Sequence, residues 1–345
     1  FKSFLIVRLD HLGDVFPATA VPKLLKEKNP SCRVFFLTSS AAAPLVENNP
    51  FVDEIIVYDA PWFARKQKKR SVSSYSFFSL AQALKARKIE AALMPRGDLR
   101  ESALTALAGI PARIGYGITG GGFLLTRQLP YRSGVHESEH WLDLLKAFGI
   151  PAPSLEGRVY LSESEKNAAE HRLEKWGVSP ALRRIGIQVD AGTPAKEWPF
   201  ENLKELLSSC LRELPRSQLI LVGSDADKSR RLRECLSPPA GQWADLVGRT
   251  SLRELLYLLG KMDIFIGPDS GPSHMAAGLG VRTLFLYSGT NRTEEWKPLA
   301  ESAAFLKNTV PCAPCGLLVC NVKGHPCMSG ISASEVFTLL NQRPS

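Results

Sequence analysis

The chain has 345 residues, of which 44% are hydrophobic and 22% are charged, as in an ordinary globular protein. This length suits two domains of roughly 150 to 180 residues better than one. No apolar run reaches the roughly 18 residues of a membrane-spanning helix, so we expect none. The seven cysteines form no disulfide-like pattern over most of the chain, which favours a reducing, cytoplasmic location.

The positive charge is concentrated in the first half. The net charge is +9, and residues 1–150 contain 20 Lys and Arg against 13 Asp and Glu. A basic run contributes much of this excess: Arg65, Lys66, Lys68, Lys69 and Arg70. Such a run attracts an anionic glycolipid or the cytoplasmic face of the inner membrane, unless it is simply a solvated loop. No RNA-binding motif accompanies it, so we expect no nucleic acid partner.

In chain order, the first half alternates short apolar strands with helical patterns. We predict strands at 4–9, 33–37, 54–58 and 90–94 and helices at 15–28, 42–48, 77–87 and 99–108. This alternation, with short loops, is typical of a parallel sheet covered by helices on both faces.

A stretch rich in Pro, Gly and Ser at 149–161 is the predicted linker. After it we predict strands at 184–189, 218–222, 264–267 and 283–287, the last clear strand, and helices at 163–176, 200–213, 226–235, 252–259 and 274–279. We therefore expect two Rossmann-like α/β domains, 1–155 and 156–345, facing across a cleft that binds ligands at the carboxyl ends of the strands. The last helix is expected to pack back on the first domain.

The first polar constellation, RLDHLGD at residues 8–14, follows the first strand and opens the first helix. Asp14 has two interpretations: a carboxylate that caps the helix, or a general base that takes a proton from a substrate hydroxyl. A cap alone does not explain why Arg8, His11 and Asp14 gather at one strand end.

The second constellation, GPDSGPSH at residues 267–274, joins a strand to a helix in the second domain. Ser270 suits the N-cap and Pro272 the first turn, while Gly271 allows close approach to the backbone. Exposed N–H groups at such a turn bind phosphate, and Asp269 and His274 are placed to add sugar and diphosphate contacts. The alternative is a well-capped helix with a satisfied histidine.

The third constellation is a further strand-end loop, DAGTPAKEWP at residues 190–199. Its Lys196 is a candidate to neutralise a diphosphate leaving group, and the alternative is a solvated lysine beside Glu197.

Four cysteines crowd near the end of the chain: Cys312, Cys315, Cys320 and Cys327, with His325 among them. This spacing suits a structural zinc or iron ion bound by thiolates, and the alternatives are free thiols or disulfides. Four thiolates would leave no open coordination position, so a catalytic metal is not expected.

Together, in this order along nearly the whole chain, these motifs resemble glycosyltransferase family 9, the heptosyltransferases of lipopolysaccharide core assembly. The resemblance rests on RLDHLGD, AGTPAKEWPFENL, DSGPSHMAAGLG, VPCAPCGLLVC and the segment 98–116. It implies a bacterial enzyme of the GT-B fold that transfers heptose from ADP-heptose with inversion. The chain departs from the family where Asp10 and His11 replace two small residues.

The resemblance also implies roles for particular residues. Asp14 would be the general base. The residues implied to bind the nucleotide sugar are Thr193, Lys196, Asp269, Ser270, Gly271, Pro272 and His274. The residues expected at the anionic acceptor are Arg8, His11, Arg65, Lys66, Lys68 and Lys69. Because Lys196, His274 and a helix N-terminus would stabilise the leaving diphosphate, we expect catalysis to need no cofactor.

Other functions remain open from the sequence. The same fold suits a transferase with another nucleotide sugar, or with a protein or other glycan as acceptor. A nucleotide-sugar epimerase would turn over donor without acceptor. A non-catalytic protein that binds an anionic glycan would release no nucleotide at all.

Overall fold

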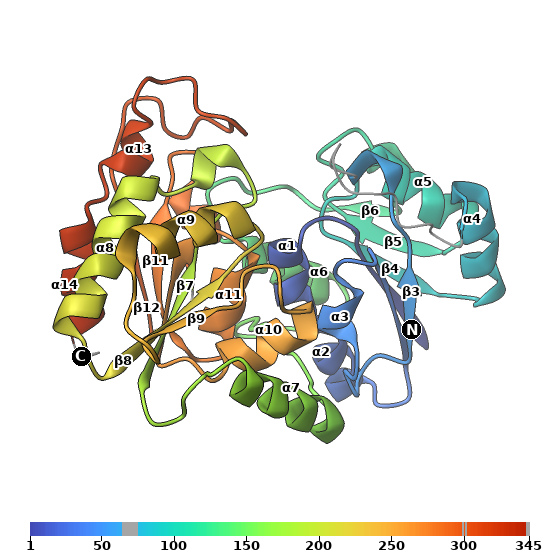
Figure 1. Cartoon of the computed structure of the whole chain (residues 1–345). Coiled ribbons are helices and arrows are strands. Elements are labelled where there is room, and N and C mark those ends of the chain that lie inside the picture. The colour runs from blue at the N-terminus through green and yellow to red at the C-terminus, as the bar shows by residue number, and fades with distance from the viewer. Residues whose placement is uncertain (64–74, 299, 301, 343–345) are drawn as a thin grey trace. The chain divides into compact units, whose positions relative to one another are not determined.

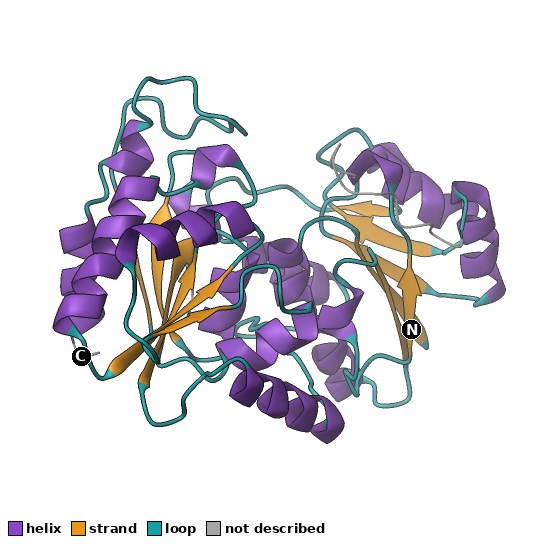
Figure 2. Cartoon of the chain, in the orientation of Figure 1, coloured by secondary structure: helices purple, strands orange, loops and turns teal. Residues whose placement is uncertain are grey.

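The computed structural model describes residues 1–63, 75–298, 300 and 302–342 of the chain. The chain divides into two compact units, Phe1–Tyr160 and Leu161–Ser345. The division falls within the Pro-rich stretch at 149–161. In the described residues, each unit contains a six-stranded parallel sheet with helices packed around it (Figure 1, Figure 2).

The sheet of the first unit is built from short, buried strands. They are β1 (Ser3–Arg8), β2 (Arg33–Thr38), β3 (Glu54–Val57), β4 (Ala91–Met94), β5 (Ala112–Gly115) and β6 (Arg127–Gln128). Their order across the sheet is β3-β2-β1-β4-β5-β6, and every neighbouring pair is parallel. All six residues of β1 are buried, because a parallel strand covered on both faces needs a continuous apolar run.

The helices of the first unit follow the strands. They are α1 (Leu12–Ala18), α2 (Val21–Lys28), α3 (Ala43–Val46), α4 (Phe77–Ala86), α5 (Leu99–Leu107) and α6 (Glu137–Ala147), with short 3₁₀ turns η1 (Pro61–Phe63) and η2 (Gly122–Leu124). The prediction of a single helix at 15–28 is therefore wrong. It is two helices, because Pro22 lies in the first turn of α2, where its missing N–H costs nothing.

The sequence patterns missed three elements of this unit. Strands β5 and β6 have only 4 and 2 residues, too few for a recognisable alternation. Helix α6 begins after His136, whose ring nitrogen accepts a hydrogen bond from the N–H of Ser138. Histidine is not among the preferred capping residues, so the start of α6 carries a weak signal.

The second unit repeats the topology of the first. Its strands are β7 (Arg183–Gln188), β8 (Ser217–Val222), β9 (Trp243–Asp245), β10 (Ile264–Pro268), β11 (Arg282–Tyr287) and β12 (Ala303–Lys307). Their order is β12-β11-β10-β7-β8-β9. Counted within each unit, both sheets have the 3-2-1-4-5-6 order of a Rossmann fold, with its reversal of strand order at β1/β4 and at β7/β10. The carboxyl ends of these strands are where such sheets bind ligands.

The helices of the second unit surround this sheet. They are α7 (Glu163–Lys175), α8 (Phe200–Glu213), α9 (Ala226–Leu236), α10 (Leu252–Leu259), α11 (Gly271–Gly278), α12 (Thr293–Trp296), α13 (Pro326–Ser329) and α14 (Ala333–Asn341), with the 3₁₀ turn η3 (Pro194–Lys196). Strand 283–287 is not the last strand, because β12 pairs with it along the sheet edge. Helix α11 begins three residues earlier than predicted, at Gly271, since Pro272 fits its first turn.

The last helix, α14, packs against the core of its own unit. It lies beside α8 (Figure 1) and contacts β11. Val336 and Leu340 of α14 are completely buried in the core of the second unit. Burial of a side chain of this size stabilises the fold by about 1.5–3 kcal/mol, which fixes the helix there.

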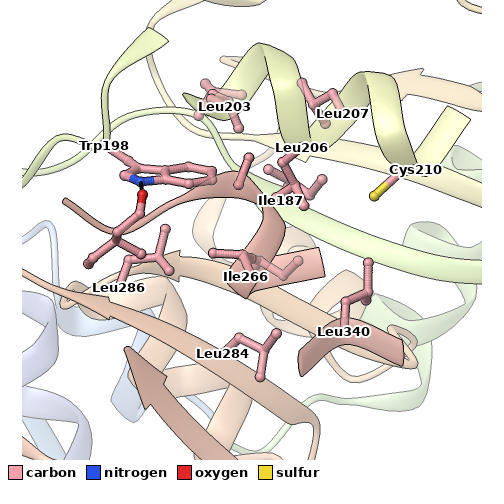
Figure 3. Close-up of a cluster of buried hydrophobic side chains, with 14 of the residues drawn as sticks. Ile187, Trp198, Leu203, Leu206, Leu207, Cys210, Ile266, Leu284, Leu286 and Leu340 are labelled. Atoms are coloured by element: carbon pink, nitrogen blue, oxygen red, sulfur yellow. Dashed lines mark hydrogen bonds between the residues drawn. The ribbon is translucent and has the colours of Figure 1, made fainter. Parts of the chain in front are cut away.

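Trp198 anchors the loop after β7 to the same core (Figure 3). Its ring lies with Ile187, Leu203, Ile266 and other buried side chains of this core. Its indole N–H donates to the carbonyl of Ile331 at 3.0 Å, so the buried polar atom is satisfied. Trp198 therefore attaches the loop to the core two residues after Lys196.

None of the helices in the described parts of the chain is long and apolar enough to cross a membrane.

Candidate functional site

The first polar cluster lies at the carboxyl end of β1 and is centred on Arg8. This guanidinium is almost completely buried, and its side chain is 3% exposed. Its Nε lies 2.9 Å from Asp10 Oδ1, while its Nη2 donates to Asp14 Oδ1 at 3.0 Å and to Glu137 Oε1 at 3.1 Å. Residues from β1, from α1 and from the start of α6 therefore meet at one strand end.

Two further charged groups border this cluster from neighbouring elements. Arg96, which follows β4, lies 3.4 Å from Asp10 Oδ2. Glu101, on α5, is 2% exposed, and its Oε2 is buried without a hydrogen-bond partner. Because β1 and β4 are neighbours at the reversal of strand order, both groups lie where the Rossmann topology predicts a ligand site.

The excess of carboxylates changes the pKa values in this cluster. Burial, the nearby Asp10 and, to a smaller extent, Glu137 raise the pKa of Asp14 to about 7, although Arg8 acts to lower it. Burial, Asp98 and Asp10 raise the pKa of Glu101 to about 8. A carboxylate with a pKa near neutrality is suited to accept a proton from a hydroxyl group at physiological pH.

Asp14 does not cap helix α1, so that interpretation is wrong. The N-cap position of α1 is His11, and no side chain caps it. Asp14 lies in the first turn, where its own N–H donates to the carbonyl of His11 at 2.9 Å. Its carboxylate accepts a hydrogen bond from Arg8 instead, and its side chain is 16% exposed.

The second polar cluster lies at the carboxyl end of β10 and is centred on Asp269. Three side chains donate to this carboxylate: Lys196 Nζ at 2.7 Å, Asn291 Nδ2 at 2.9 Å and His274 Nε2 at 2.9 Å. Lys196 Nζ also donates to the carbonyl of Asp269 at 3.1 Å. The structure thus brings together Lys196, Asp269 and His274, which the sequence had placed in two separate motifs.

The charge balance here is the reverse of that around Arg8. Burial alone would raise the pKa of Asp269, but the hydrogen bond from His274 and the positive charge of Lys196 hold it well below its ordinary value. Asp269 is therefore ionised at any ordinary pH and cannot act as a base near neutrality. Lys196 and His274 keep part of their surface exposed, 21% and 17%, towards solvent.

The turn between β10 and α11 differs in one detail from the prediction. Ser270 occupies the N-cap position, but its hydroxyl donates to Gln188 Oε1 at 2.7 Å and does not cap the helix. Gly271 and Pro272 form the first turn of α11, whose leading N–H groups have no partner within a helix. The turn keeps the features of an anion-binding helix start.

The loop that carries Lys196 is tied to the Cys-rich segment. Thr193 precedes the η3 turn, and its carbonyl accepts the N–H of Lys196 at 3.0 Å. The N–H of Ala195 donates to the carbonyl of Leu318 at 3.0 Å, and His325 Nε2 lies 3.0 Å from the carbonyl of Ala195. Hydrogen bonds between the Cys-rich segment and Ala195 therefore help to position the loop that carries Lys196.

The expected structural metal is not supported. Cys312, Cys315, Cys320 and Cys327 line one small cavity together with His325. Yet within the described residues no three His, Cys, Asp or Glu side chains are placed to hold one ion. Cys327 is buried in α13, Cys312 is exposed, and His325 is bonded to Ala195, so the side chains surround the cavity without converging.

The predicted acceptor residues differ in their burial and in whether the structure describes them. Arg8 lies buried beneath Asp14 with carboxylates around it, while His11 is exposed at the start of α1. Arg65, Lys66, Lys68, Lys69 and Arg70 lie outside the described residues.

Sequence reasoning missed Glu137 and Asn291. Glu137 opens a helix that was not predicted, so nothing connected it to Arg8. Asn291 follows β11 by four residues, and the rule that strand ends gather at one edge of the sheet could have found it.

The two six-stranded parallel sheets define the fold class, an α/β protein of the GT-B type. A glycosyltransferase family 9 protein from Veillonella parvula has a TM-score of 0.82 at 21% identity, covering 98% of this chain and 95% of that chain. The ADP-heptose lipopolysaccharide heptosyltransferase II of Escherichia coli has a TM-score of 0.76 at 21% identity, covering 99% and 98%. Heptosyltransferase WaaC of E. coli, solved with ADP-2-deoxy-2-fluoro heptose, has a TM-score of 0.69 at 16% identity, covering 98% of each chain.

Sequence comparison then gives the family. The model of glycosyltransferase family 9 (heptosyltransferase) matches residues 77–325, and the chain belongs to this family. A putative glycosyltransferase from Haemophilus influenzae is 23% identical over 91% of this chain and 90% of its own length. Lipopolysaccharide heptosyltransferase 2 from E. coli K12 is 22% identical over 88% of each.

Proposed function

We propose that this glycosyltransferase transfers heptose from ADP-heptose to a lipopolysaccharide core acceptor, with Asp14 as general base. The observation that carries the proposal is the contrast between the clusters. Asp14 has a pKa near neutrality among other carboxylates, whereas Asp269 is held ionised by Lys196 and His274. One cluster suits proton removal and the other suits a negatively charged donor.

The donor would bind at the second unit. Lys196 and His274, with the start of α11, place positive charge and N–H donors beside Asp269. Thr193, Ser270, Gly271 and Pro272 shape the same loops, and Asp269 itself suits sugar or ribose hydroxyls. The relatives support ADP-heptose as donor, because they include lipopolysaccharide heptosyltransferases and a WaaC structure solved with ADP-2-deoxy-2-fluoro heptose.

In the reaction, Asp14 takes the proton of the acceptor hydroxyl. The hydroxyl oxygen attacks the anomeric carbon from the face opposite the diphosphate, and the bond from this carbon to the diphosphate oxygen breaks with inversion. The electron pair leaves with ADP. Lys196, His274 and the N-terminus of α11 stabilise the charge that develops there, so this route assigns no step to a metal ion.

The acceptor would bind at the first unit, near Asp14. His11 is exposed three residues before Asp14, and the partly exposed Arg96 lies 3.4 Å from Asp10 Oδ2 in the same cluster. The basic run at 65–70, which lies outside the described residues, has a charge suited to the phosphates of a glycolipid. Such an acceptor is anchored in a bilayer, so we place the enzyme's work at the cytoplasmic face of the inner membrane.

The test is release of ADP from ADP-heptose, with and without a heptose-deficient lipopolysaccharide, in buffer that contains EDTA. We expect release that depends on the acceptor, and ADP-glucose should be a poor donor. Release without acceptor would indicate hydrolysis or another reaction, and acceptor-dependent release from a different nucleotide sugar would contradict the donor assignment. Activity that returns only on addition of Mg²⁺ would contradict the role given to Lys196 and His274.

A further inference from the structure

A single nitrogen of Arg8 is shared by two carboxylates. Its Nη2 donates to Asp14 Oδ1 at 3.0 Å and to Glu137 Oε1 at 3.1 Å. Glu137 comes from the first residue of α6, 129 positions further along the chain, and its side chain is 18% exposed. The attraction of Arg8 for Asp14 is therefore divided with a second acid.

We propose that Glu137 is a positioning residue that keeps Asp14 basic by competing for Arg8. The proposal rests on the assignment of Asp14 as general base in the proposed function. In this scheme Glu137 is not the base itself, since it acts on the reaction through Arg8 and Asp14.

The other charged groups around the pair act in the same direction or are already paired. Asp10, on the loop after β1, is 2.9 Å from Arg8 Nε and is shared with Arg96. Glu101, on α5, adds a fourth acidic side chain, which is largely protonated at neutral pH because its pKa is raised to about 8. Among the described residues, Asp10 and Glu137 thus share the buried guanidinium with Asp14.

Glu137 is the first residue of α6, and its charge acts on Asp14 directly as well as through Arg8. Its charge repels that of Asp14, and this repulsion raises the pKa of Asp14, as burial and Asp10 do to a greater extent. Loss of Glu137 would remove the acid that shares Arg8 Nη2 with Asp14 and would make Asp14 a weaker base.

The test compares Glu137→Gln with wild type across the pH range. We expect the ascending limb of kcat against pH to move about one unit lower, since a close like charge is removed. The plateau above the limb should fall about threefold, because a weaker base transfers the proton less readily. The KM for the donor should not change, since the donor is bound at the second unit.

Two matched variants separate this role from a structural one. Glu139→Gln removes a half-exposed acid two residues away on α6, which pairs only loosely with Arg132 at 3.9 Å, and it should leave the limb in place. Glu137→Asp keeps the charge, so its ascending limb of kcat against pH should lie close to that of wild type. A limb that stays fixed in Glu137→Gln, or that moves equally in Glu139→Gln, would overturn the proposal.

A direct titration of Asp14 tests the inference without measuring turnover. The ¹³C signal of the Asp14 carboxyl carbon, assigned by its loss in Asp14→Asn, should titrate at lower pH in Glu137→Gln than in wild type. An unchanged midpoint would reject the inference about Glu137. Normal turnover in Asp14→Asn would instead reject Asp14 as base, so the two failures are distinguishable.

Discussion

The two strand-end clusters occupy the same topological position but have opposite charge balance. At the end of β1, Arg8 is surrounded by acids, and the pKa of Asp14 rises to about 7. At the end of β10, Asp269 is surrounded by Lys196, His274 and Asn291, and its pKa falls. The same carboxylate chemistry therefore yields a group that can exchange a proton and a group that cannot.

The comparison shows how one fold supplies two different functions. The Rossmann topology determines where polar side chains gather, but the ratio of acids to cations determines what they do. Asp14 and Asp269 both follow a buried strand, and both contact a cation. Their other neighbours distinguish them, which are further acids around Asp14 and the donors His274 and Asn291 at Asp269.

The largest expected effect is on turnover, in Asp14→Asn. An amide cannot take the hydroxyl proton, so we expect kcat to fall about a thousandfold, within the usual range for loss of a general base. Binding of ADP, measured by calorimetry, should remain unchanged because Lys196 and His274 are intact. Turnover close to that of wild type would show that the raised pKa of Asp14 has no catalytic use.

Asp269→Asn should break the second cluster and lower stability. Lys196 and His274 would lose the buried carboxylate between them, and we expect the free energy of unfolding to fall by about 3 kcal/mol. Asp14→Asn serves as the control, since removal of an acid from an acidic cluster should leave stability equal or higher at pH 8. Urea denaturation measures both, and equal losses in the two variants would remove the proposed contrast.

Lys196→Ala tests whether the cation of the second cluster serves the donor. We expect kcat/KM for the donor to fall about tenfold or more, because the leaving diphosphate loses a positive charge. Lys204→Ala is the matched control, since Lys204 is a surface lysine on α8 that pairs with Glu201. If kcat/KM for the donor falls equally in both variants, Lys196 does not act specifically on the diphosphate.

The smallest effect concerns the pH dependence of stability. The pKa of Glu101 is about 8 in the folded protein, above its ordinary value of 4.5, so the folded state holds the proton more tightly than the unfolded state. Stability from this group is present at low pH and is lost as pH rises from about 5 towards 8. Glu101→Gln should flatten that decline, so that it loses less stability than wild type between pH 5 and pH 8. Parallel stability curves for the two proteins would contradict the raised pKa.

Much of the fold was predictable because its signals are local. Buried strands such as β1 and β8 are continuous apolar runs, and α8 matched the predicted helix at 200–213. Each is readable within one short window of residues. The edge strands β6 and β9, with 2 and 3 residues, are held by pairing with a neighbour and carry no such signal.

The sequence by itself determined the two repeating α/β patterns and the polar residues at their strand ends, because apolar periodicity and turn residues act over a few positions. Tertiary structure alone decided which charges meet. Arg8 donates a hydrogen bond to Glu137, which lies 129 positions away in the sequence, and Lys196 donates one to Asp269, which lies 73 positions away. Strand order brings these partners together, and burial then sets their pKa values, so the assignment of a base and of an ionised anchor arises only once the sheet has formed.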